Sequence, residues 1–353
     1  MFFFPCMSNN LKPLFGLTLS EIEKECSRLG LPSYAALQIA NWLYKNDVSE
    51  IEQMSNLSKD SRFKLGEEFI IGLTAPVQFQ LSSDGTTKYL FPTLNGRFVE
   101  AAYIPEIKRN TLCVSSQVGC RMGCSFCMTA TQGFQGNLSA GEILNQIRSL
   151  PERKSLTNIV YMGMGEPLDN LDEVLKSIEI LTSQYGLGIS PKRITVSTIG
   201  IVPAIKVFLE KSACNLAVSL HSPFDKERQQ LMPISKLHQL NDIVHTIKSF
   251  NIEKQRRISF EYIVFKGLNH SRLHANELAK VLNGIRCRIN LLRYHKLPHG
   301  RLESPGDEEL FEFKELLEKK GLITTVRKSR GLDIDAACGL LSTKKANQQN
   351  SEN

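Results

Sequence analysis

The sequence predicts an α/β fold, a partial (βα)6 barrel that follows a small N-terminal helical domain and a β-hairpin extension. From about residue 110, short runs of apolar and β-branched residues alternate with amphipathic helical stretches, giving six strand–helix units. Repeated units of this kind imply parallel strands. Six units are too few for a closed eight-stranded barrel, so a partial barrel fits. Its chemistry is expected at the C-terminal ends of the strands, as in closed barrels. A doubly wound open sheet is the alternative architecture.

The domain boundaries are expected where these patterns change. They divide the chain into a helical, RNA-binding accessory domain at 1–85, a hairpin at 86–109, the barrel at 110–340 and a disordered tail at 341–353. In the helical domain, Ser20 and Glu23 have the spacing of a capping box. A second short helix is expected around Trp42, the only tryptophan.

The hairpin is expected over residues 88–104, where two apolar runs flank Asn95-Gly96. This dipeptide is a strong signal for a two-residue turn. Glu100 is an acid in the otherwise mostly apolar second strand. From the residues alone, it reads as a carboxylate at a strand edge, exposed to water.

The strand–helix alternation gives a specific set of elements. The expected barrel strands are Thr111–Ser115, Asn158–Met162, Arg193–Thr198, Asn215–Leu220, Ile258–Phe265 and Arg288–Leu292, with a further run at Leu322–Val326. The expected helices lie near 139–149, 168–183, 202–211, 238–250, 271–282 and 307–320, and Ser139 with Glu142 caps the first.

Composition and charge narrow the class of protein. The chain has 353 residues, of which 42% are hydrophobic, and a net charge of +7. Residues 1–100 carry nine basic and eleven acidic side chains, so the remainder carries +9. Such an excess fits either a polyanion such as RNA or a solvated basic surface. No run approaches the length of a membrane span, and either Met1 or Met7 could be the start.

Three cysteines, Cys120, Cys124 and Cys127, have the spacing C-x3-C-x2-C directly after the first barrel strand. A full protein site for a [4Fe–4S] cluster uses four thiolates, so three would leave one iron open to a substrate or cofactor. A structural zinc site is the alternative, with His221 or Cys113 as conceivable fourth ligands. Nine cysteines in the chain are too few for a disulfide scaffold, which favours a reducing cytosol.

A second motif, Gly163-Met-Gly165-Glu166-Pro167, follows the second barrel strand. Glycines at a strand end allow the backbone to approach a ligand closely. Glu166 supplies a carboxylate suited to an α-amino group. Alone, the motif is better explained by an ordinary turn. One strand–helix unit after the cysteine loop, it indicates a ligand site.

Five segments in order resemble the RlmN family of the radical S-adenosylmethionine superfamily. They are Val114–Cys120, Thr131–Phe134, Gly163–Pro167, Ser219–His221 and Arg330–Gly339, and the resemblance covers residues 15 to 340. It implies a radical S-adenosylmethionine barrel, a [4Fe–4S] cluster held by Cys120, Cys124 and Cys127, and methylation of carbon 2 of adenine in 23S rRNA and tRNA. It also implies S-adenosylmethionine contacts from Gly165, Glu166, Ser197, Ser219, Leu220, His221 and Asn290.

The same resemblance assigns covalent roles to two further cysteines and a carboxylate. Cys338 would carry the methyl group, although from its residues alone it reads as a small buried hydrophobe. Cys113 would attack the sulfur of Cys338, forming a transient disulfide and releasing the methylated base. Glu100 would accept the ring proton. Cys6, Cys26, Cys214 and Cys287 match no motif and are read as structural.

Two departures and two rivals remain at this stage. Met128–Thr131 differs from the small residues usual beside the third cysteine, and Leu291–Arg301 lacks the usual Asn-Pro turn, although Arg293, His295, Lys296 and Arg301 are available for phosphates. One rival is a Cfr-like enzyme that methylates carbon 8 of adenine. The other is an RNA-binding protein with a structural metal and no catalysis. A cytoplasmic monomer, reduced by an external donor such as flavodoxin, is expected.

Overall fold

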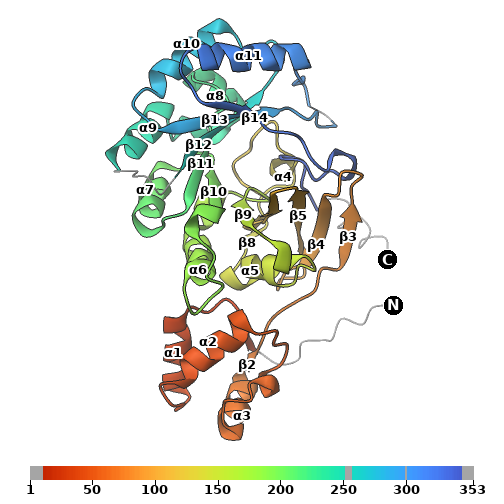
Figure 1. Cartoon of the computed structure of the whole chain (residues 1–353), viewed down its shortest axis with the longest axis vertical. Coiled ribbons are helices and arrows are strands. Elements are labelled where there is room, and N and C mark those ends of the chain that lie inside the picture. Colours follow the sequence, from red (N-terminus) through yellow and green to blue (C-terminus); the bar gives the residue numbers. More distant parts are fainter. Residues whose placement is uncertain (1–10, 251–256, 299, 344–353) are drawn as a thin grey trace.

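The computed structural model describes residues 11–250, 257–298 and 300–343. An N-terminal group of helices is followed by a ten-stranded sheet with helices packed along it (Figure 1). Within these residues, no helix is long and apolar enough to cross a lipid bilayer. The two possible start residues, Met1 and Met7, and the cysteine read as structural, Cys6, lie outside the described residues.

The N-terminal unit contains three α-helices, α1 (Leu19–Arg28), α2 (Ala35–Lys45) and α3 (Lys59–Glu68). Two short parallel strands, β1 (Lys12–Pro13) and β2 (Phe69–Ile70), join its ends. Helix α1 is capped by Thr18 with Glu21, two residues before the expected pair Ser20 and Glu23. Since Ser20 already lies inside the first turn, its hydroxyl cannot serve as the cap. Trp42 lies in α2, where a second helix is expected.

The ten-stranded sheet has the order β14-β13-β12-β11-β10-β9-β6-β5-β4-β3. Its seven parallel strands are β6 (Arg109–Cys113), β9 (Asn158–Tyr161), β10 (Ile194–Thr198), β11 (Asn215–Ser219), β12 (Ile258–Val264), β13 (Cys287–Arg293) and β14 (Thr324–Val326). Each new parallel strand is added beside the previous one, on the same side. A doubly wound sheet reverses this direction at a switch point. The strand order therefore confirms the partial barrel and excludes the doubly wound alternative.

The crossover helices between the parallel strands match the expected positions. They are α5 (Ala140–Arg148), α6 (Leu171–Thr182), α7 (Val202–Lys211), α9 (Leu240–Ser249), α10 (Arg272–Val281) and α11 (Asp307–Lys319). Ser139 and Glu142 form the capping box of α5, as the sequence predicts. The short helices α4 (Met128–Thr131) and α8 (Asp225–Leu231), and the strand pair β7 (Gln117–Val118) with β8 (Gly136–Asn137), belong to loops at the C-terminal strand ends.

Three antiparallel strands, β3 (Gln78–Leu81), β4 (Thr87–Pro92) and β5 (Phe98–Glu106), extend the sheet beyond β6. The sequence predicts only two. The loop between β4 and β5 is one residue longer than the expected turn, because the Thr93 N–H donates to the Arg97 carbonyl at 2.7 Å. Gly96 at φ 69° supplies the left-handed residue that three-residue hairpin loops require.

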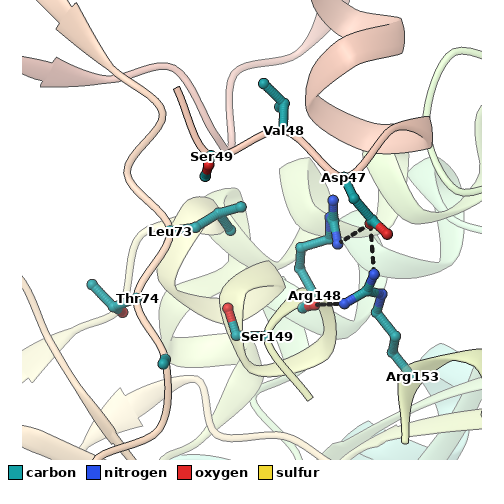
Figure 2. Close-up of a pocket in the computed structure, with 9 residues that line it drawn as sticks. Asp47, Val48, Ser49, Leu73, Thr74, Arg148, Ser149 and Arg153 are labelled. Atoms are coloured by element: carbon teal, nitrogen blue, oxygen red, sulfur yellow. Dashed lines mark hydrogen bonds and ion pairs between the residues drawn. The ribbon is translucent and has the colours of Figure 1, made fainter. Parts of the chain in front are cut away.

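An ion-pair bridge joins the N-terminal unit to the barrel (Figure 2). Asp47 accepts from Arg148 at 2.7 Å and from Arg153 at 2.6 Å. The Arg148 guanidinium also donates to the Asn46 carbonyl at 2.6 Å. These contacts line a surface pocket between the loop after α2 and the end of α5, so the N-terminal unit is anchored to the first crossover helix.

The packed part of the C-terminal segment extends beyond residue 340, where the sequence predicts that the disordered tail begins. Leu341 and Thr343 are buried, although 341–353 is the expected tail. The Thr129 hydroxyl donates to the Leu341 carbonyl at 2.8 Å, and the Met128 N–H donates to Gly339 at 2.7 Å. These contacts tie the segment to α4. Residues 344–353 lie outside the described residues.

Candidate active site

The three cysteines lie on the loop between β7 and α4, at the C-terminal end of the first parallel strand. The loop is closed by a close backbone approach, since the Cys120 N–H donates to the Gly133 carbonyl at 3.2 Å. Gly119 permits this approach, because a Cβ there would stand 1.7 Å from the Gly133 oxygen. A three-thiol loop is thus held at the end of the barrel where chemistry is expected.

The wall behind the cysteines is apolar. Met122, Phe126, Met232 and Phe265 pack with the three half-buried cysteines in one cluster. Burial raises the pKa of Cys120 to about 12 and that of Cys124 well above its ordinary value. A metal must therefore displace protons from these thiols on binding. Three soft sulfur donors in a half-buried, apolar surround fit an iron–sulfur cluster.

A mononuclear zinc site fits this geometry less well. Among the described side chains, no three His, Cys, Asp or Glu residues converge on one point where a single ion could bind. His221, a conceivable fourth ligand, uses its Nδ1 to accept the Ile263 N–H at 3.0 Å. Burial lowers the pKa of His221 to about 3. A four-iron cluster places each thiolate on a different iron, so its ligands need not meet at one point.

The Gly163–Pro167 segment lies against the cysteine loop. Gly163 allows close packing, since a Cβ there would stand 2.7 Å from both the Ser115 hydroxyl and the Val114 carbonyl. Gly165 has φ 95° and would clash with Gln117 at 2.5 Å if it carried a Cβ. Only glycine fits here, which explains the glycine-rich sequence.

Glu166 lies buried between the ends of β9 and β10. Its carboxylate accepts the Ile199 N–H at 2.9 Å and the Leu168 N–H at 3.1 Å. Burial raises its pKa to about 7 despite these donors. The charge of Glu166 contributes to the raised pKa of Cys120 and Cys124, so the carboxylate faces the cysteine loop. The Thr198 side chain makes a third hydrogen bond to the carboxylate, and a carboxylate accepts about four, which leaves capacity for an ammonium group of a ligand.

The remaining expected ligand contacts form a polar row across the sheet. Ser219, Glu261, Asn290 and Thr325 are register partners on β11 to β14. The Asn290 amide donates to Glu261 at 2.7 Å and accepts from Thr325 at 2.7 Å. Ser197 lies opposite Ala217, two residues before Ser219, and therefore on the same face. The structure thus brings Ser197, Ser219 and Asn290 to one face.

Arg228, which the sequence analysis does not identify, binds the backbone at the C-terminal ends of β10 and β11, beside this polar row. Its side chain is fully buried. It donates to the carbonyls of Leu220 at 3.1 Å, Ser219 at 3.3 Å and Ile199 at 3.4 Å. The neighbouring residue His221 has φ 55°, a left-handed conformation that is uncommon outside glycine. Arg228 therefore fixes the backbone of the Ser219–His221 segment.

Cys113 and Cys338 approach each other at the end of β6. Cys113 is buried with Ala102 and Ala336 in a small cluster, whereas Cys338 is exposed in the loop after residue 334. Burial raises the pKa of Cys113 to about 12, and the nearby Cys338 thiol adds to this effect. The two cysteines, 225 positions apart, are therefore close enough for their charges to interact. The exposure of Cys338 contradicts the interpretation as a buried hydrophobe.

Arg327 lies near the two thiols and pairs with Glu261, and neither residue was identified from the sequence. The Arg327 guanidinium lies 3.4 Å from Glu261 and 3.6 Å from the Met162 sulfur. Met162 packs against Cys113. The charge of Arg327 lowers the pKa of Cys113, opposing burial. A buried charge has no sequence signature of its own, because its partner is distant in the chain.

Glu100 is a buried carboxylate on a central strand, not an exposed one at an edge. It is 7% exposed, because β5 lies between β4 and β6. The Lys88 ammonium lies 3.1 Å from Oε1, and the Ser342 N–H donates to Oε2 at 2.8 Å. Burial raises the pKa of Glu100 above its ordinary value. Glu100 shares the end of the sheet with Cys113.

Of the other residues noted in the sequence, Cys26 and Cys214 are buried in the core and Cys287 packs against it. Arg293 is held by Asp307 and the Pro305 carbonyl. His295 lies 2.9 Å from the Ser329 hydroxyl. Of the four residues noted in that loop, Lys296 and Arg301 are the exposed ones.

Two family models match the chain. The radical SAM superfamily matches residues 114–278, and the ribosomal RNA large subunit methyltransferase N-terminal domain matches residues 12–71. The second match covers the helical unit, whose own sequence carries no functional motif. The radical SAM superfamily implies a [4Fe–4S] cluster and S-adenosylmethionine, and the three-cysteine loop fits both.

Relatives match almost the whole chain. A Bacteroides fragilis protein, "Probable dual-specificity RNA methyltransferase RlmN", is 53% identical over 96% of this chain and 98% of its own length. A Syntrophus aciditrophicus protein, "Dual-specificity RNA methyltransferase RlmN", is 42% identical over 93% and 95%. A crystal structure of a radical SAM methyltransferase from Sphaerobacter thermophilus is 37% identical, with a TM-score of 0.87, covering 94% of this chain and 99% of that one. This chain belongs to the RlmN family of the radical SAM superfamily.

Proposed function

We propose that this protein methylates carbon 2 of a specific adenine in 23S rRNA and of an adenine next to the anticodon in tRNA. The observation that carries the proposal is the grouping of Cys338, Cys113 and Glu100 at the end of the barrel that also holds the three-cysteine loop. The names of the relatives, dual-specificity RNA methyltransferases, support the substrate class.

The reaction needs a carbon radical because carbon 2 of adenine is a poor nucleophile. It lies between two ring nitrogens and is electron-poor, so ordinary polar methyl transfer has no electron pair to use. Cys120, Cys124 and Cys127 would hold the cluster, while Gly165, Glu166, Ser197, Ser219, Leu220, His221 and Asn290 would bind S-adenosylmethionine. When bound, these two groups supply the one-electron chemistry that turns a methyl group on sulfur into a carbon radical.

The protein's own residues complete the transfer. Cys338 carries the methyl carbon and attaches it to the base, which links the protein covalently to RNA. Glu100 accepts the ring proton. The adduct would give up its unpaired electron, for which the bound cluster would be the one-electron acceptor. Cys113 then attacks the sulfur of Cys338, the carbon–sulfur bond breaks with its electron pair on carbon, and the carbon gains a proton to become the methyl group. The disulfide that remains would be reduced by an external thiol before the next turnover. The exposure of Cys338 suits the residue that must reach RNA, and the burial of Cys113 suits one that acts after it.

Mass spectrometry of nucleosides from a deletion strain tests the reaction. The expected result is loss of 2-methyladenosine from 23S rRNA and tRNA, restored by the parent gene and not by Cys338→Ala. Loss of 8-methyladenosine instead would overturn the choice of carbon in favour of the Cfr-like rival. The Cys338 peptide from cells should be one methyl group heavier, and an unmodified Cys338 in active protein would refute its role.

The partners and the compartment follow from the same chemistry. We propose an external one-electron donor such as flavodoxin, since the described residues contain no second three-cysteine loop that could hold a relay cluster. A cytoplasmic monomer fits the RNA substrates and the free cysteines. Sedimentation of the purified protein, alone and with flavodoxin, tests the monomeric state and the association with flavodoxin.

A further inference from the structure

A buried lysine accompanies Glu100. Lys88 lies on β4, where its register partner on β5 is Ala102, two residues beyond Glu100. Residues placed diagonally in this way share one face of the sheet. The side chains of Lys88 and Glu100 are only 11% and 9% exposed. Lysine is rarely this buried unless it is paired, so the position calls for a partner, and Glu100 is that partner.

The carboxylate is held at both oxygens. Lys88 lies 3.1 Å from Oε1, and the Ser342 N–H donates to Oε2 at 2.8 Å. Two charged groups face the Glu100 carboxylate, Lys88 from β4 and Asp335 from the C-terminal segment. The Lys88 charge favours ionisation of Glu100, and the Asp335 charge opposes it. Cys113 lies in the same cross-strand row as Lys88 and Ala102. Lys88 is therefore the cation on the side of the sheet where the thiols meet.

We propose that Lys88 is a positioning residue for Glu100, which holds its carboxylate ionised and aimed at the Cys113–Cys338 pair. The proposal rests on the proposed function, in which Glu100 accepts the ring proton. A protonated acid cannot accept that proton. Burial favours the protonated form, and an adjacent ammonium favours the ionised form. Without Lys88, less of the enzyme would carry a competent base at neutral pH.

The first test follows the reaction by stage. Lys88→Met keeps the length of the side chain and removes its charge, while Lys88→Arg keeps the charge. With reconstituted enzyme and RNA, Lys88→Met should still methylate Cys338 but form product about tenfold more slowly at pH 7, with more RNA covalently bound. Its pH profile should move to higher pH by about one unit, and Lys88→Arg should restore the parent profile. An unmoved profile would overturn the proposal.

The second test needs no cluster. The titration of the Glu100 carboxyl, followed by carbon-13 NMR in cluster-free protein, should move to higher pH in Lys88→Met. If it does not move, Lys88 does not hold the carboxylate, whatever the enzyme does. If it moves but Glu100→Gln forms product normally, the role of Glu100 in the proposed function fails instead.

A matched control separates this effect from the loss of any lysine ion pair. Lys314 on α11 pairs with Glu318 at 2.7 Å, far along the chain from the site. Lys314→Met should leave both the pH profile and the Glu100 titration unchanged. If Lys314→Met moved them as Lys88→Met does, the specific role of Lys88 would be refuted. Thermal denaturation of both variants checks that each is folded.

Discussion

The buried thiol of Cys113 should be slow to react until the site opens. Its pKa is about 12, against 9.0 for an ordinary cysteine, because it is buried. At pH 8, the thiolate fraction is then about one thousandth of that of an exposed thiol. The higher pKa makes each thiolate about 20-fold more nucleophilic, since reactivity rises with basicity by 0.4–0.5 log units per pKa unit. We expect a net rate about 50-fold lower, before any steric hindrance.

Exchange with an aromatic disulfide measures this rate directly. Cluster-free Cys338→Ser protein is used, so that Cys338 cannot remove the label from Cys113. Tandem mass spectrometry assigns the label within the tryptic peptide Asn110–Arg121, which also carries Cys120. N-acetylcysteine gives the reference rate, and urea-unfolded protein shows that Cys113 is chemically competent. Labelling of folded Cys113 as fast as the reference would refute the reasoning.

Three further predictions concern the ligand-facing residues. Gly165→Ala should abolish S-adenosylmethionine binding. It should also lower stability more than Gly267→Ala does, because both glycines have a left-handed backbone but only a Cβ at Gly165 clashes with Gln117, whereas a Cβ at Gly267 meets no atom within 4 Å. Arg228→Met should lower the free energy of unfolding in urea by about 2 kcal/mol, because the Ile199 and Ser219 carbonyls lose the guanidinium donor while the Leu220 carbonyl keeps the Ser222 N–H. Between pH 4.5 and 7, the parent should lose about 3 kcal/mol of stability that Glu166→Gln does not lose.

The sign of the Glu166 effect follows from its raised pKa. The folded group binds a proton up to about pH 7, whereas the unfolded group releases it near 4.5. The native state therefore binds more protons in this window, and stability falls as pH rises. Denaturation of cluster-free protein at several pH values checks this. Equal pH dependence in the parent and in Glu166→Gln would contradict the Glu166 prediction. Equal losses of stability in Gly165→Ala and Gly267→Ala would contradict the glycine prediction, and an unchanged free energy of unfolding in Arg228→Met would contradict the arginine prediction.

The barrel could be predicted because its strands are buried on both faces. Such strands are rich in apolar and β-branched residues, as in Asn215–Ser219 and Ile258–Val264, where most positions are buried, and the helices between them are amphipathic. Strand β3 was missed because every residue from Gln78 to Leu81 is exposed, so no buried face shapes its sequence. Helix α8 was missed because its seven residues are mostly polar and bury only Arg228 and Leu231.

The site could be predicted where its residues lie close together in the sequence, and not where residues distant in the sequence come together only in the fold. The three cysteines and Gly163–Pro167 are local motifs, and backbone geometry explains their spacing. Glu100 was placed at an exposed edge because the sequence does not show that the hairpin pairs with the first barrel strand, which makes β5 an interior strand between β4 and β6. Lys88, Glu261 and Arg327 each depend on a partner on another strand, which no window of sequence reveals.

The strand order also has a consequence for how the protein is made. Parallel strands join the sheet in the order in which the ribosome synthesises them, from β6 to β14. Glu100 precedes this series, Cys113 ends its first strand, and Cys338 follows its last strand. The ribosome therefore synthesises Cys338 only after every strand of the sheet. An incomplete chain lacks the methyl carrier, so the two thiols can meet only when synthesis has passed residue 338.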